Sequence, residues 1–103
     1  MATTIVQVCD AITAALRGEG FFDAERNDGE RAAMIGPALE RASGELGCRL
    51  AVSEHLPDGG CTVLAEDVPG VVTIVARREV DHHGKGAAAD SVDPDFGVTW
   101  ALT

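Results

Sequence analysis

The residues best suited to metal or acid–base chemistry in this sequence are two adjacent histidines, His82 and His83. A zinc site needs four ligands within tetrahedral reach, and two of them usually come as a close pair such as Cys-x-x-Cys or His-x-x-x-His. The other candidate ligands, Cys48, His55 and Cys61, form no such pair. Adjacent histidines in a strand also point to opposite faces. We therefore interpret His82 and His83 as solvated side chains, and we expect no metal and no other cofactor.

Nucleophilic catalysis would need a serine or cysteine beside a histidine and a carboxylate, usually on a strained turn. Ser43, Ser53 and Ser91 stand in no such context. Cys61 follows two glycines, and a predicted hairpin could bring it near His55. A chain of this length nevertheless leaves little room for a substrate cleft. The sequence predicts that the protein is not an enzyme.

Acidic residues dominate the charge of the chain. Its 103 residues include 17 Asp and Glu against eight Lys and Arg, which gives a formal net charge of −9. Nucleic-acid-binding proteins usually carry a basic stripe that displaces counterions from phosphate, and this sequence has none. Sequence-specific nucleic-acid binding is therefore not expected.

The carboxylates themselves allow two interpretations. They either keep a small protein soluble, or they form a surface that serves a partner. Such a surface would occupy a basic site by mimicking phosphate, or it would line a channel through which DNA slides without sticking. Composition does not separate these two roles. The residues that we place on this surface lie near predicted hairpin ends: Glu54, Asp58, Glu66 and Asp67.

Length and composition predict one small domain spanning residues 1–103. Hydrophobic residues make up 46% of the chain but aromatic ones only 4%, so the core must come mainly from aliphatic side chains. No apolar run approaches the roughly 20 residues that span a bilayer, and no charged-then-apolar leader opens the chain, so we expect no membrane partner. Three widely spaced cysteines do not suggest a disulfide framework. We expect them as small buried hydrophobes in a reducing compartment.

The first half of the chain predicts two helices. The first begins at a capping box formed by Thr4 and Gln7 and ends at Gly20. Its apolar face repeats every three or four residues: Ile5, Val8, Cys9, Ile12 and Leu16. Residues 30–46 look helical with a break, because Pro37 suits a first helical position better than an interior one. Between the helices, Phe21 and Phe22 either begin a short strand or fill the core from a turn.

After Gly47 the apolar period changes from helical to alternating. Strands are predicted at 49–53, 61–65, 71–80 and 97–103, with turns at Pro57–Gly60 and Pro69–Gly70. Residues 81–95 lack periodicity and are predicted to form a long flexible loop. The fold class is therefore α+β, with two helices packed on one face of a roughly four-stranded antiparallel sheet.

Three segments together resemble a known family. They are the helix Thr3-Thr4-Ile5-Val6-Gln7-Val8-Cys9-Asp10-Ala11-Ile12-Thr13-Ala14-Ala15-Leu16, the turn Gly20-Phe21-Phe22-Asp23-Ala24-Glu25-Arg26, and the closing strand Gly97-Val98-Thr99-Trp100-Ala101-Leu102. Their type and order are similar to those of the tail-terminator and tail-completion (neck) proteins of tailed bacteriophages. The resemblance covers about the first 26 residues and the last seven.

This resemblance implies a non-enzymatic virion structural protein, commonly a hexameric ring that caps the tail tube and docks to the head. Its place would be the virion, or the host bacterial cytoplasm during assembly. Loop 81–95 would then be an arm between subunits, with His82, His83, Asp90, Asp93 and Asp95 as candidate contacts. The alternative comes from another class: a small acidic inhibitor or immunity-type protein that mimics DNA and binds a basic partner.

Overall fold

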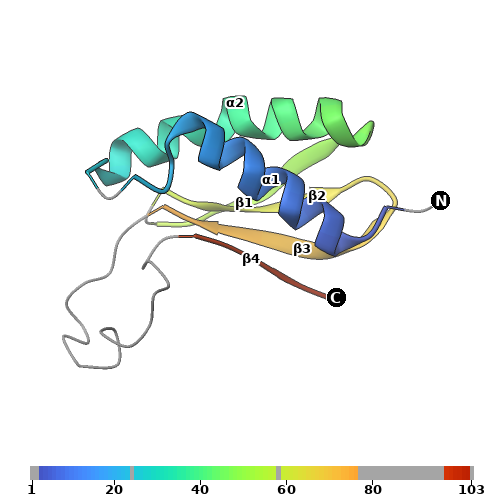
Figure 1. The fold of residues 1–103 in the computed structure, drawn as a ribbon. Helices are drawn as coiled ribbons and strands as arrows, with labels where there is room; N and C mark the ends of the chain where they lie inside the picture. The colour runs from blue at the N-terminus through green and yellow to red at the C-terminus, as the bar shows by residue number, and fades with distance from the viewer. Residues whose placement is uncertain (1–2, 24, 58, 77–96, 103) are drawn as a thin grey trace, which may run out of the picture.

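Two helices lie along one side of a four-stranded antiparallel sheet (Figure 1). The computed structural model describes residues 3–23, 25–57, 59–76 and 97–102. The elements are α1 (Ile5–Glu19), α2 (Asp28–Leu46), β1 (Leu50–His55), β2 (Cys61–Ala65), β3 (Val68–Val75) and β4 (Gly97–Ala101). The predicted α+β class is therefore confirmed. Of the two helices, neither has the length and apolar character needed to cross a membrane.

Helix α1 begins and ends where its caps predict. The Thr4 hydroxyl accepts a hydrogen bond from the Gln7 N–H, and the Gln7 side-chain oxygen accepts one from the Thr4 N–H at 2.9 Å. Gly20 closes the helix with a φ of 90°, a conformation that glycine adopts without strain. The predicted apolar face is buried against the sheet and α2, with Ala15 in addition.

Helix α2 is one continuous helix, so the predicted break at Pro37 is wrong. A second capping box starts it, because Asn27 and Glu30 exchange side chain-to-backbone hydrogen bonds of 2.8 and 3.1 Å. Pro37 has no N–H to donate to the carbonyl four residues earlier, but its ring lies on the exposed face of the helix. Buried side chains on both sides of the proline, Ile35 and Ala38, hold the two halves in one line.

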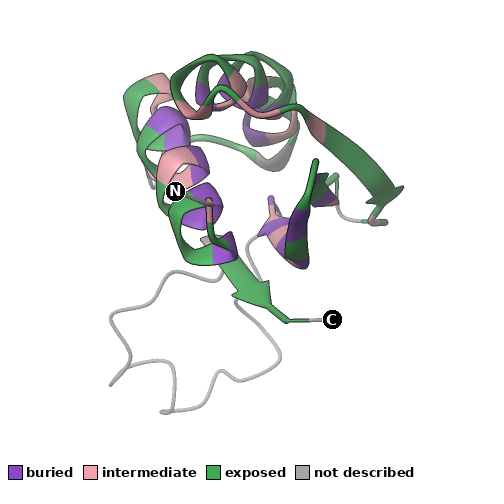
Figure 2. Ribbon diagram, turned by 90° about the vertical axis from the view of Figure 1, so that its right-hand side faces the viewer, coloured by how far each residue is buried: buried purple, intermediate pink, exposed green. Residues whose placement is uncertain are grey.

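The strands follow one another in the sheet in the order β1-β2-β3-β4, with every neighbouring pair antiparallel. Alternate residues of β2 and β3 point toward the helices and are buried: Cys61, Val63, Ala65, Val68, Val72 and Ile74. In Figure 2 the buried residues lie where helices and strands face each other. Phe21 joins this core from the turn after α1, which confirms the turn alternative for the two phenylalanines.

The turn between β2 and β3 lies at Glu66 and Asp67, so the predicted turn at Pro69–Gly70 is wrong. Asp67 has a φ of 62° and Gly70, inside β3, has a φ of 123°. A Cβ atom on Gly70 would lie 2.8 Å from Cγ1 of Ile5 and 3.0 Å from the carbonyl oxygen of Ala101. The glycine is therefore required where α1 packs directly on the backbone of β3, and the Pro-Gly pair marks an irregularity in the strand.

A buried arginine holds the connection between the helices. The Arg31 side chain is 1% exposed. Its Nε donates a hydrogen bond to the Phe21 carbonyl at 3.1 Å, and Nη2 donates one to the Asp23 carbonyl at 3.0 Å. Because buried carbonyls need a donor, the guanidinium fixes the turn that carries Phe21 into the core.

Replacing this arginine tests how much the turn contributes to stability. We expect Arg31→Met to lower the free energy of unfolding by about 2–4 kcal/mol, because two carbonyls lose a charged donor in the interior. Arg41→Met is the matched control, since Arg41 is 55% exposed and lies 3.9 Å from Glu19. That change should cost less than about 0.5 kcal/mol. Urea unfolding of both variants measures the two losses of unfolding free energy. Equal losses would contradict the structural role given to Arg31.

A second test concerns Gly60, which is buried between β1 and β2. A methyl group there would overlap the backbone carbonyl of Ile74. We expect Gly60→Ala to lower the thermal unfolding midpoint by more than roughly 8 °C. In a chain of this size, that shift corresponds to a loss of about 2 kcal/mol in unfolding free energy. Gly44→Ala, in α2 with nothing within 4 Å of the added carbon, should instead stabilise the protein by up to about 1 kcal/mol. A neutral Gly60→Ala would show that the strands separate easily at this point.

Candidate functional site

The acidic residues predicted to form one surface lie at two ends of the sheet. Glu54 stands opposite Thr62 near the start of β2, while Glu66 and Asp67 form the turn that follows β2. Thr62 and Glu66 are four positions apart along the chain, or about 13 Å of extended backbone. All three carboxylates are exposed. Asp58 lies outside the described residues, so the structure places three of the four and does not bring them together.

The residues predicted for an interface arm are not placed. His82, His83, Asp90, Asp93 and Asp95, with the whole of loop 81–95, lie outside the described residues. Within the part of the chain that is described, no three His, Cys, Asp or Glu side chains lie close enough to hold a metal ion.

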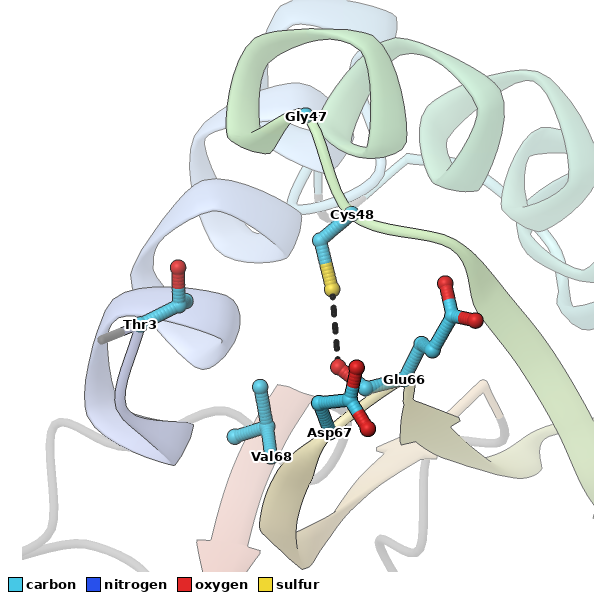
Figure 3. A pocket seen from close by; sticks show the side chains of 6 residues that line it. All are labelled: Thr3, Gly47, Cys48, Glu66, Asp67 and Val68. Atoms are coloured by element: carbon cyan, nitrogen blue, oxygen red, sulfur yellow. Dashed lines mark hydrogen bonds between the residues drawn. The ribbon is translucent and has the colours of Figure 1, made fainter. Parts of the chain in front are cut away.

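A shallow hollow of about 260 Å³ lies between the start of α1, the end of α2 and the β2–β3 turn (Figure 3). The side chains of Cys48 and Asp67 border it. The Cys48 thiol donates to the backbone carbonyl of Glu66 at 3.5 Å, so it ties the turn to the end of α2. The hollow is lined by Thr3, Gly47, Cys48, Glu66, Asp67 and Val68. Its one sulfur thus has a structural role, and its carboxylates face solvent.

Cys61 and His55 are opposite each other in the β1–β2 register, as the predicted hairpin allowed. Cys61 is buried, and burial raises the pKa of its thiol. Burial likewise raises the pKa of Cys9, against a smaller lowering by Thr13. Both thiols therefore stay protonated near neutral pH, and a protonated thiol is a poor nucleophile. The predicted role as buried core hydrophobes is confirmed for these two cysteines, whereas Cys48 is only partly buried against the core.

Two of the exposed large apolar side chains lie on β4 or directly after it. Trp100 is 44% exposed and Leu102 is 70% exposed. Trp100 is opposite Val72, whose side chain faces the helices, so the indole lies on the helix side of the sheet at its margin. Helix α1 lies over β3 and β4 and adds Val6, which is 41% exposed. We call these three exposed residues, which lie on or next to the neighbouring elements α1 and β4, the edge cluster: Val6, Trp100 and Leu102.

One side of the β4 backbone is paired with no other strand among the described residues. The carbonyl of Ala101 points toward β3, since it lies 3.0 Å from where a Cβ of Gly70 would be. Backbone polar groups alternate sides along an antiparallel strand. The N–H and C=O groups of Val98 and Trp100 therefore point away from β3, toward the open edge, where no described strand pairs with them.

The two edges of the sheet differ. Strand β1 carries a bulge between Val52 and Glu54, and Ser53 is hydrogen-bonded to Thr62 at 2.7 Å. A bulge and a charge are devices by which natural sheets prevent pairing at an edge. Strand β4 has an uninterrupted register with β3 and no charged residue from Gly97 to Leu102. Of the two edge strands in the described part of the chain, β4 is the one without such a device, and we take it with the edge cluster as the candidate functional site.

Comparisons with protein-family models, with curated proteins and with solved structures give no match to this chain. The candidate site is therefore supported by the geometry of this structure alone.

The sequence predicted the strand β4 but not that it forms an open edge of the sheet. Its signal was the run from Gly97 to Leu102, which carries the only tryptophan and no charge in a chain of net charge −9. Val6 gave no signal, because it lies on the predicted helix outside the apolar stripe. Its exposure matters only because α1 lies beside β4.

The cysteines give a direct check on the described interior. With iodoacetamide at pH 8 we expect the half-buried Cys48 to be modified first, and Cys9 and Cys61 only after urea unfolding, because burial shields them and keeps them protonated. Peptide mapping by mass spectrometry identifies the modified residue. The Cys48→Ser variant serves as the control and should leave the native protein unmodified. Rapid native labelling of Cys61 would show instead that it is an accessible nucleophile beside His55.

Proposed function

We propose that this chain is a non-enzymatic structural protein that acts by associating with copies of itself, as a neck or tail-terminator-like ring component of a tailed bacteriophage. The observation that carries the proposal is the open β4 edge with its exposed tryptophan and leucine. Large apolar groups gathered beside free backbone donors and acceptors are typical of surfaces that bind another protein.

The fold supports the resemblance in the segments that suggested it. The first quoted segment forms α1, Phe21 enters the core from the following turn, and the last segment forms β4. On this proposal the partners are further copies of the chain, up to a hexameric ring, and other virion proteins. The protein would be found in the virion or, during assembly, in the host bacterial cytoplasm.

The acidic residues have a role on the same proposal. Glu54, Glu66 and Asp67 are exposed at the two ends of the β1–β2–β3 meander. Fixed negative charge repels phosphate, so a ring lined by such residues would let DNA pass without holding it.

A second candidate is a small acidic inhibitor or immunity-type protein that binds a basic partner by mimicking DNA. The net charge of −9 and the exposure of these three carboxylates favour it. The two candidates respond oppositely to salt. Salt screens the repulsion between two acidic copies but weakens attraction to a basic partner.

Light scattering coupled to size-exclusion chromatography tests the proposal. We expect part of the protein to be oligomeric. The oligomeric fraction should grow as NaCl rises from about 0.05 to 0.5 M, because salt screens the repulsion between acidic copies. Trp100→Ser should reduce the oligomer, while Leu64→Ser, an exposed leucine on the sheet face opposite the helices, should leave it intact. A monomer at every salt concentration and at high protein concentration would overturn the proposal. Low-salt binding to a basic protein would then favour the second candidate.

A further inference from the structure

We infer that β4 pairs with β4 of a second copy of this chain, antiparallel and across a two-fold axis at Thr99. The inference rests on the proposed self-association and names the surface that carries it. Pairing of this kind would join two four-stranded sheets into one of eight strands.

The choice of β4 over β1 follows from how each edge is built. A second strand adds to an edge only where the backbone is regular and the side chains tolerate a neighbour. The bulge at Ser53 and the carboxylate of Glu54 disturb β1. Five consecutive residues of β4 keep their register with β3 without a bulge, a proline or a charge.

We assign a second copy of the chain as the binding partner, because the β4 edge carries no charge that would repel the same edge of another copy. Two chains of charge −9 repel each other, and they approach most easily where neither presents a carboxylate. The stretch from Gly97 to Leu102 meets this condition. A basic partner, in contrast, would be drawn to the carboxylates at Glu54, Glu66 and Asp67, which lie on other elements.

The backbone directions fix the register. The groups of Val98 and Trp100 point to the open edge, so these two residues must make the new hydrogen bonds. An axis at Thr99 places Val98 of each copy opposite Trp100 of the other, and it pairs all five residues of the strand. Thr99 itself then meets its counterpart in a non-hydrogen-bonded pair, with Cα atoms about 4.5 Å apart.

The same register covers exposed apolar surface. Val98 and Trp100 lie on the helix side of the sheet, since they are opposite Ile74 and Val72. Each exposed indole would therefore pack on the valine of the other copy. Aromatic and β-branched side chains opposite each other are among the favourable cross-strand pairs.

A two-fold contact constrains any larger assembly. A contact of the same patch with itself closes after two copies, whereas a cyclic ring needs two different patches. A six-subunit ring that contains this contact would be a trimer of dimers.

Cysteine cross-linking tests the pairing in the full chain. In a Cys48→Ser background, Thr99→Cys should form a disulfide-linked dimer under mild oxidation, because the paired Cα atoms lie within disulfide range. Ala101→Cys is the matched control on the same strand and face. In this register its counterpart is about 13 Å away along the strand, so we expect roughly tenfold less dimer.

The single tryptophan provides a second measurement that needs no substitution. Pairing covers Trp100, so raising the protein concentration should shift its fluorescence to shorter wavelength and protect it from acrylamide. Equal or greater cross-linking of Ala101→Cys would overturn the register. An oligomer by light scattering without Thr99→Cys cross-linking or a tryptophan shift would overturn the inference and leave the proposed function standing. A monomer throughout would overturn both.

Discussion

The structure depends on how closely α1 approaches the backbone of the sheet. A core with few aromatic residues offers little volume, so the helix must lie near the strands to exclude water. At Gly70 this approach brings Ile5 against the β3 backbone, where no larger residue fits. The same contact positions the beginning of α1 beside the end of β4, as Figure 1 shows. The edge cluster exists because α1 and β4 are held side by side.

Phe21 does contribute aromatic volume to this core, and the charged side chain of Arg31 holds its turn in place. Phe21 is fully buried and lies on a turn, where backbone carbonyls cannot be satisfied by a helix or a sheet. Arg31 supplies the missing donors from α2. The guanidinium therefore connects the two helices through backbone atoms. Phe22 packs at an edge-to-face angle of 80° on Phe21 and lies under the Arg17 guanidinium, which extends the same junction to the surface.

Local signals in the sequence predicted local structure well. The caps of α1 and the strands β2 and β4 could be predicted because they depend on neighbouring residues: Thr4 with Gln7, Gly20, and alternating apolar positions. The two errors came from tertiary packing. Pro37 was expected to interrupt a helix that burial of its neighbours keeps continuous, and Gly70 was expected to form a turn when it serves the approach of α1.

The candidate site could not be predicted for a similar reason. A sequence pattern shows that Gly97 to Thr103 alternates, but it does not show that the strand lies at the margin of the sheet or which of its sides is open. Those properties follow from the strand order and from the direction of the Ala101 carbonyl. The burial of Arg31 likewise depends on a turn and a helix whose relative placement no short window of residues contains.

The order of the strands also determines how each is recruited during folding. Strands β1, β2 and β3 are joined by short connections, so their pairing involves contacts near in the chain. The partner of Val75 in β4 is Gly97, with the 21 residues 76–96 between them. Closing that span costs about 2 kcal/mol more chain entropy than closing a two-residue turn. Of the three strand pairings, the pairing of β3 with β4 therefore has the largest loop-closure cost.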